Sequence, residues 1–197
     1  MDKISSLNLS LDKILIQLII PALVALCPYL LLVFHCPDIK NYWLNPNNIA
    51  LFITCLVIIG LIIGMILENI GSFIELKFYD KLNEKSDDKF NQIWEAYLLL
   101  NFEHEPIGNK YIKTILSRMK FELSFGIALI IATLGTYIYN WNYSIFGNDS
   151  CIFKISILLI IEIVIAGYFI YEGYQSSKVL AKTRKILVAK FAIPPIG

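Results

Sequence analysis

The carboxylate of Glu162 lies where a charged group is costly, because about ten apolar residues separate it from either end of the apolar run 152–171, a run long enough to cross a bilayer. Such a group faces protein or water, or stays protonated. We expect hydrogen bonds to Thr133, to Thr54 or to the same Glu of a second subunit. A ring of Glu162 side chains predicts a cation path or a titratable gate, whereas an uncharged Glu162 would only join neighbouring helices.

Small residues and acids follow one another along a second apolar run. Gly60 and Gly64 form a G-x-x-x-G motif, which lets helices approach closely, and Glu68 continues the same spacing. This pattern predicts a contact between helices. Four carboxylates near the ends of the apolar runs could bind a divalent ion, gather at a vestibule or simply be solvated; they are Glu68, Glu75, Glu122 and Glu172.

Residue patterns for catalysis are sparse. The chain has two histidines, His35 and His104, and the sequence Glu103-His104-Glu105 is not the helical H-E-x-x-H chelate of metalloproteases. The chain also lacks a Walker A motif and the G-x-S-x-G motif of hydrolases. We therefore expect no enzyme, no cofactor and no metal site, and we keep a lipid-modifying enzyme that uses Glu68, Glu75 and His104 as an alternative.

The elements that must position these residues are membrane-spanning helices. Hydrophobic residues make up 57% of the 197 residues and charged residues 17%, and the mean hydropathy is +0.64. A net charge of +1 gives no field that would attract nucleic acid. Four runs have the roughly 20 apolar residues that a bilayer requires, namely 14–34, 49–67, 121–139 and 152–171. The sequence predicts an all-α polytopic membrane protein with two transmembrane hairpins.

The distribution of positive charge predicts the orientation of these hairpins. All but two of the 17 Lys and Arg residues lie in the termini or in the central segment, and only Lys40 and Lys154 lie in the hairpin loops. Cytoplasmic segments carry the excess of cations, so both termini and the central segment should be cytoplasmic. Cys36 and Cys151 lie near the outer ends of spans and could form a disulfide, although unpaired cysteines are an equal alternative.

A helical module is expected between the hairpins, because apolar residues recur there with helical spacing. Phe90, Trp94 and Tyr97 lie on one apolar face, which either packs within the module or docks a soluble partner or a second subunit. The expected units are residues 1–71 with the first hairpin, the module 72–120, the second hairpin 121–173 and a basic amphipathic tail 174–197. Cations expected to contact lipid head groups are Lys110, Lys113, Arg118, Lys182, Arg184 and Lys185.

The layout of four spans with cytoplasmic ends and about fifty residues between two hairpins resembles the small membrane subunits of bacterial antiphage defence systems, such as the membrane component of Kiwa and four-span effectors. This resemblance implies an oligomer in the bacterial inner membrane that works with a soluble partner. We expect a non-enzymatic, oligomeric sensor or effector that forms a pore or perturbs the membrane. A passive anchor for a soluble enzyme is the alternative.

Overall fold

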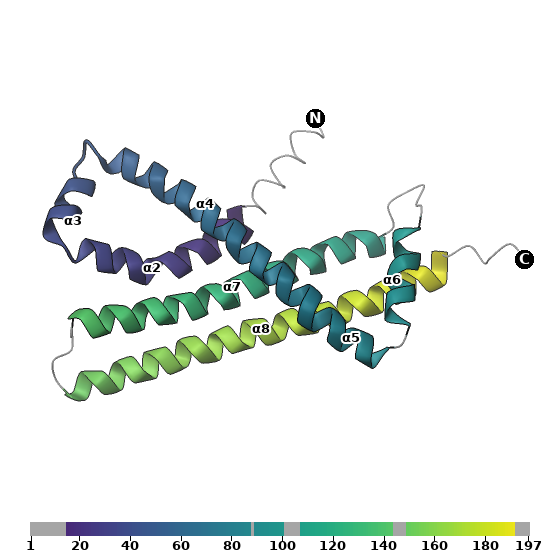
Figure 1. Ribbon diagram of the computed structural model, residues 1–197. Coiled ribbons are helices and arrows are strands. Elements are labelled where there is room, and N and C mark those ends of the chain that lie inside the picture. Colours follow the sequence, from purple (N-terminus) through teal and green to yellow (C-terminus); the bar gives the residue numbers. More distant parts are fainter. Residues whose placement is uncertain (1–14, 88, 101–106, 144–148, 192–197) are drawn as a thin grey trace, which may run out of the picture.

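The computed structural model describes residues 15–87, 89–100, 107–143 and 149–191, and these residues form helices and short connections without a strand (Figure 1). Four of the helical segments are long and apolar enough to cross a membrane. Helices satisfy their own backbone hydrogen bonds, which the hydrocarbon core demands. The structure therefore confirms an all-α chain with four candidate membrane spans.

The element bounds differ from the expected spans mainly in length. Three of the four spanning helices extend well beyond their apolar runs, because nothing in the adjoining sequence stops them. In chain order the elements are η1 (Leu15–Ile19), α2 (Ile20–Phe34), α3 (Pro37–Trp43), α4 (Ile49–Ile74), η2 (Glu75–Tyr79), α5 (Asp80–Ser86), α6 (Phe90–Leu98), α7 (Ile107–Tyr143) and α8 (Asp149–Phe191); η1 and η2 are π-helical.

The long helices have two distinct ends (Figure 1). At the loop end, α2 ends and α3 leads to the start of α4. The end of α7 and the start of α8 lie at the same end. At the polar end, α4 continues through η2 into α5, α6 stands beside α8, α7 begins and α8 finishes. Helices α7 and α8 lie side by side along most of their length. Helix α4 crosses α7, and its continuation through η2 and α5 reaches α8. Helix α2 packs mainly on α7, so the first two spans separate toward the loop end.

A π-helical turn keeps one face of the second span directed at the bundle. The buried positions on α4 are Gly60, Gly64, Leu67 and Gly71, which follow the 3–4 residue spacing of an α-helix. The next buried side chains are those of Tyr79 and, four residues later, Asn83. The wider turn of η2 absorbs the extra residue that would otherwise rotate this face away from the bundle.

The basic segment that the sequence sets apart as a tail is, up to Phe191, the last part of the fourth spanning helix. Helix α8 runs without a break from Asp149 to Phe191. No Pro or Gly interrupts residues 174–191, so nothing stops the helix there. Leu180 and Leu187 are buried against Ile112 and Ile115 of α7, which makes this segment part of the bundle.

Candidate functional site

A network of charged and polar groups joins α7 to α8 just beyond the apolar part of these helices. Arg118 Nε donates to Glu122 Oε1 at 2.6 Å, and its terminal nitrogen donates to Glu172 Oε2 at 3.1 Å. Ser176 Oγ donates to the second oxygen of Glu122 at 2.8 Å. The Glu122 side chain is almost fully buried, while that of Arg118 is 63% exposed. Glu122 is therefore a buried acceptor with a hydrogen-bond donor at each of its two oxygens.

The same level of the bundle also holds the second span. Lys120 Nζ of α7 donates to Glu68 Oε1 of α4 at 2.8 Å. The buried Tyr79 hydroxyl donates to the carbonyl of Ile170 at 2.7 Å, and Asn83 Nδ2 of α5 donates to Ser177 Oγ at 2.9 Å. We call these contacts, together with those of Arg118, Glu122, Glu172 and Ser176, the polar junction. It connects all three helices that continue from the spans to the polar end.

The polar junction also gives partners to three of the four carboxylates that the sequence places near the span ends. Glu68, Glu122 and Glu172 each accept from a cation, which satisfies their charge without a metal ion. Within the described ranges, no group of three His, Cys, Asp or Glu residues is arranged to hold a metal. Residues Glu103, His104 and Glu105 lie outside the described part of the chain.

A buried arginine, Arg184, links α8 to α6 at the polar end. The Arg184 side chain is 8% exposed, and its guanidinium carbon lies 3.7 Å from the centre of the Trp94 ring and 5.9 Å from that of Tyr97. This is cation–π stacking. Arg184 is therefore buried between α8 and α6 and not displayed on the surface, and its contact with a lipid head group stays a prediction. The Trp94 and Tyr97 faces that stack on it are covered within the chain.

The neighbouring cations have different surroundings. Lys185 Nζ donates to Asp87 Oδ2 at 2.6 Å across the cleft between α8 and the turn before α6. This hydrogen bond, with a second from the Lys89 backbone, holds the pKa of the Asp87 carboxyl below its usual value. Lys110 and Lys182 are exposed. Lipid contact therefore remains a prediction for Lys110, Lys113, Arg118, Lys182 and Lys185.

Glu162 lines a cleft of about 470 Å³ among α2, α7 and α8. Its walls are mostly apolar, and polar groups come from Thr136, Tyr139 and Asn140. Glu162 Oε2 is buried without a hydrogen-bond partner among the described residues.

Thr133 and Thr54, the partners expected for Glu162 within the chain, form hydrogen bonds elsewhere. Thr133 Oγ1 donates to the Leu129 carbonyl of its own helix, and Thr54 Oγ1 donates to that of Ala50. Each threonine hydroxyl donates a hydrogen bond to the carbonyl four residues earlier, which is a common bond for threonine within a helix. A contact between Glu162 groups of different subunits stays a prediction.

The two glycines of the G-x-x-x-G motif have different surroundings. A Cβ atom on Gly64 would lie 2.4 Å from the Leu18 carbonyl oxygen, so η1 and α4 pass each other there with backbones in contact. A Cβ on Gly60 would meet nothing within 4 Å, so Gly60 makes no comparable contact. Cys36 is exposed and the side chain of Cys151 lies outside the described residues, so their disulfide stays a prediction.

Sequence reasoning missed Ser176, Tyr79 and Asn83, the polar side chains that complete the polar junction. The sequence contained one signal for this network. Arg118 and Glu122 are polar residues four apart at the start of the third span, and Glu172 and Ser176 are such a pair at the end of the fourth. Residues four apart share a helix face. Two such faces at one depth predict an interhelical network.

No protein-family model, curated protein or solved structure matches this chain.

Proposed function

We propose that this protein couples a cytoplasmic helical module to its membrane spans and acts as an oligomeric membrane sensor or effector in the bacterial inner membrane. The observation that carries the proposal is the continuity of α4, α7 and α8 from the apolar spans to the polar end, together with the polar junction that connects them. A displacement of any one of these helices at the polar end therefore acts on the others and on the spans. Packed helices of this kind switch between discrete arrangements.

Charge and exposure support the membrane part of the proposal. Large apolar side chains of α4 and α8 are exposed along the spans, for example Ile62, Met65, Ile163 and Val164. Lipid or a second copy of the chain covers such faces in a membrane. The cations gathered at the polar end support its placement in the cytoplasm. The cleft lined by Glu162 offers a polar point inside the spans at which permeability is set.

The test is ion flux through vesicles that contain the purified protein. We expect wild-type protein to raise cation flux above that of empty vesicles and Glu162→Gln to lower it at least several-fold. Thr54→Val is the matched control, because that hydroxyl bonds only within its own helix. Wild-type flux equal to that of empty vesicles, with and without cell extract, refutes the effector role.

Coupling is tested separately by loosening the polar junction. The double variant Glu122→Gln/Ser176→Ala should change the flux several-fold, because the spans no longer follow the polar end. Thr183→Ala is the control on α8, since its hydroxyl bonds only Val179 of the same helix. If the double variant and the control both conduct as wild type while Glu162→Gln does not, the spans form a pore without coupling.

A passive anchor for a soluble protein is the second candidate, and one surface favours it. Leu98 and Leu99, at the end of α6, are 63% and 85% exposed, and exposed apolar side chains of this size mark docking surfaces. Leu99→Glu should release a co-purifying partner, whereas Glu95→Gln on the same helix should retain it. Trp94→Ala is a poor test, because it also unpacks Arg184. Native mass spectrometry of the extracted complex reports both the partner and the number of subunits.

A further inference from the structure

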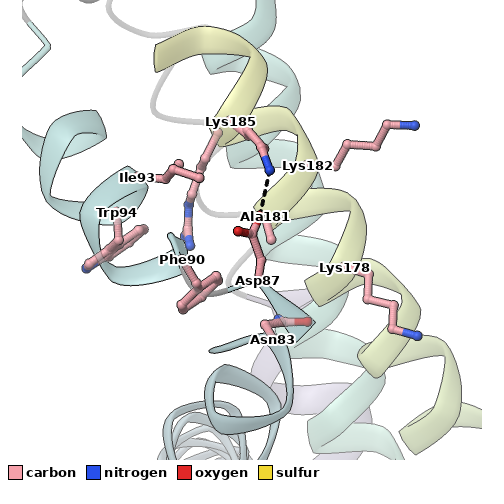
Figure 2. Close-up of a pocket in the computed structure, with 10 residues that line it drawn as sticks. Asn83, Asp87, Phe90, Ile93, Trp94, Lys178, Ala181, Lys182 and Lys185 are labelled. Atoms are coloured by element: carbon pink, nitrogen blue, oxygen red, sulfur yellow. Dashed lines mark hydrogen bonds and ion pairs between the residues drawn. The ribbon is translucent and has the colours of Figure 1, made fainter. Parts of the chain in front are cut away.

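The cleft between α6 and α8 has the charge and the unused hydrogen-bond donors of an anion site (Figure 2). It has a volume of about 320 Å³, and its lining includes four cationic side chains and one carboxylate, that of Asp87. Small-molecule sites in proteins begin at about 300 Å³. A positively charged concave surface of this size concentrates small anions.

Arg184 supplies the donors at the centre of this cleft. Trp94 covers one face of its guanidinium, and the N–H groups of a guanidinium lie in its plane, so stacking leaves their edge available. Nε of Arg184 is buried and has no hydrogen-bond partner in the described part of the chain. An arginine stays charged in proteins, and a buried charged donor without an acceptor is unfavourable. A planar fork of this kind pairs with phosphate or carboxylate oxygens.

The surrounding charges direct an anion to one side of Arg184. The neighbouring cavity lies on the side of η2 and α5 and is lined by three acids, Glu75, Asp80 and Glu84, and by Lys81. The excess of acids makes that side less favourable for an anion. The negative charges of Asp80 and Glu75 attract the Arg184 guanidinium, but neither carboxylate accepts a hydrogen bond from Arg184 Nε. On the α8 side the exposed Lys178 and Lys182 line the cleft, and Figure 2 shows their side chains extending away from Trp94 and Asp87. Lys178 Nζ lies 4.4 Å from the centre of the Tyr174 ring, so these two lysines add positive charge at the rim of the cleft.

We propose that this cleft binds a phosphate group, with Arg184 as the central contact, Lys178, Lys182 and Lys185 as the surrounding charges and Trp94 beside the organic part of the ligand. Four cations suit a phosphate dianion with several acceptor oxygens better than a single carboxylate. The phosphate belongs to a soluble molecule or to a lipid head group. Arg184 lies twelve residues beyond Glu172, or about 18 Å along the helix axis, which exceeds the thickness of one head-group layer and favours a soluble molecule.

Asp87 competes with such a ligand for Lys185. Its carboxylate is the one acid in the lining and accepts from Lys185 at 2.6 Å. A bound phosphate takes over Lys185, so removal of the Asp87 charge should strengthen binding. This opposite sign separates a phosphate site from a general loss of folding, which weakens binding in every variant.

The test uses Trp94 fluorescence in full-length protein carrying Trp43→Phe and Trp141→Phe, which leaves Trp94 as the reporter of the three tryptophans. The protein, in phosphatidylcholine nanodiscs, is titrated with pyrophosphate at constant ionic strength, with chloride as the control anion. We expect a saturable change that chloride does not produce. Asp87→Asn should lower the Kd several-fold, Lys178→Gln/Lys182→Gln should raise it several-fold, and Arg184→Lys should raise it at least tenfold.

Two results overturn the proposal: no saturable change with pyrophosphate, or equal Kd values in the parent, Asp87→Asn and Lys178→Gln/Lys182→Gln proteins. The lysine variant keeps the test valid if Arg184→Lys fails to fold, because both lysines are exposed. Discs with phosphatidic acid distinguish the source. An unchanged Kd there indicates a soluble ligand, and loss of the pyrophosphate response indicates a lipid head group. Phosphate binding does not depend on the proposed function; only the effect of the bound phosphate on the membrane spans does. If pyrophosphate binds and no cation flux is measured, the proposed function is refuted and the phosphate site stands.

Discussion

Gly60 and Gly64 allow the packing of the second span to be tested by one methyl group placed at two positions. Both glycines lie on the buried face of α4, one turn apart. At Gly64 a Cβ would approach the Leu18 carbonyl oxygen to 2.4 Å and the carbonyl carbon to 2.8 Å, whereas at Gly60 it would meet nothing within 4 Å. Gly64→Ala should therefore displace η1 from α4, and Gly60→Ala should leave the bundle unchanged.

The size of the effect follows from this geometry. Real Cβ atoms essentially never lie within 3.0 Å of another heavy atom, so the Leu18 backbone must move by about 0.6 Å or more. Overpacking of this kind costs about 1–3 kcal/mol. The gain in helix propensity from Gly to Ala, about 1 kcal/mol, occurs at both positions and cancels between them. Gly64→Ala should thus have a free energy of unfolding about 1–3 kcal/mol below that of Gly60→Ala.

Thermal unfolding of the two variants in the same detergent measures this difference. At about 2–4 °C per kcal/mol for a chain of this length, the Tm of Gly64→Ala should lie about 2–12 °C below that of Gly60→Ala. Equal Tm values would show that η1 does not pack on α4 as described. A Gly60→Ala protein that is the less stable of the pair would assign the close contact to the wrong glycine.

Three further predictions concern the polar end. Glu122→Gln and Ser176→Ala should each lower the free energy of unfolding by about 1–3 kcal/mol. A double-mutant cycle should give a coupling energy of at least about 0.5 kcal/mol between them, and strict additivity would refute their shared hydrogen bond. The pKa of Asp87 is lowered in the folded protein, so its ion pair with Lys185 stabilises the fold above the usual carboxyl pKa of about 4. This stabilisation is lost as the pH falls through the lowered pKa. Trp94 fluorescence should change over the same pH range in the wild type and should show no such step in Asp87→Asn. Trp94→Ala should cost about 2 kcal/mol, since it removes the ring beneath a buried guanidinium, and an unchanged Tm would contradict the cation–π contact.

The membrane spans could be predicted from the sequence because hydropathy acts on each segment by itself. The run 49–67, for example, is apolar over the full thickness of a bilayer, and a segment of this kind satisfies its backbone only as a helix. The apolar spacing of Phe90, Trp94 and Tyr97 likewise predicted the helix that the structure shows as α6. These properties depend on neighbours within a few residues, which the sequence contains directly.

The contacts of the candidate site depended on the tertiary structure, because they join residues that are far apart in the chain. Arg118 and Glu172 are separated by 54 positions, and Lys185 and Asp87 by 98. Arg184 shows the same limit: its charge and its place in a basic segment indicated a lipid contact, whereas the continuation of α8 beside α6 buries it against Trp94. The apolar sequence thus determined that the helices form and which of them are long and apolar enough to cross a bilayer. Their relative rotation and position decided which polar groups meet, because a hydrogen bond requires two groups within about 3 Å and in line.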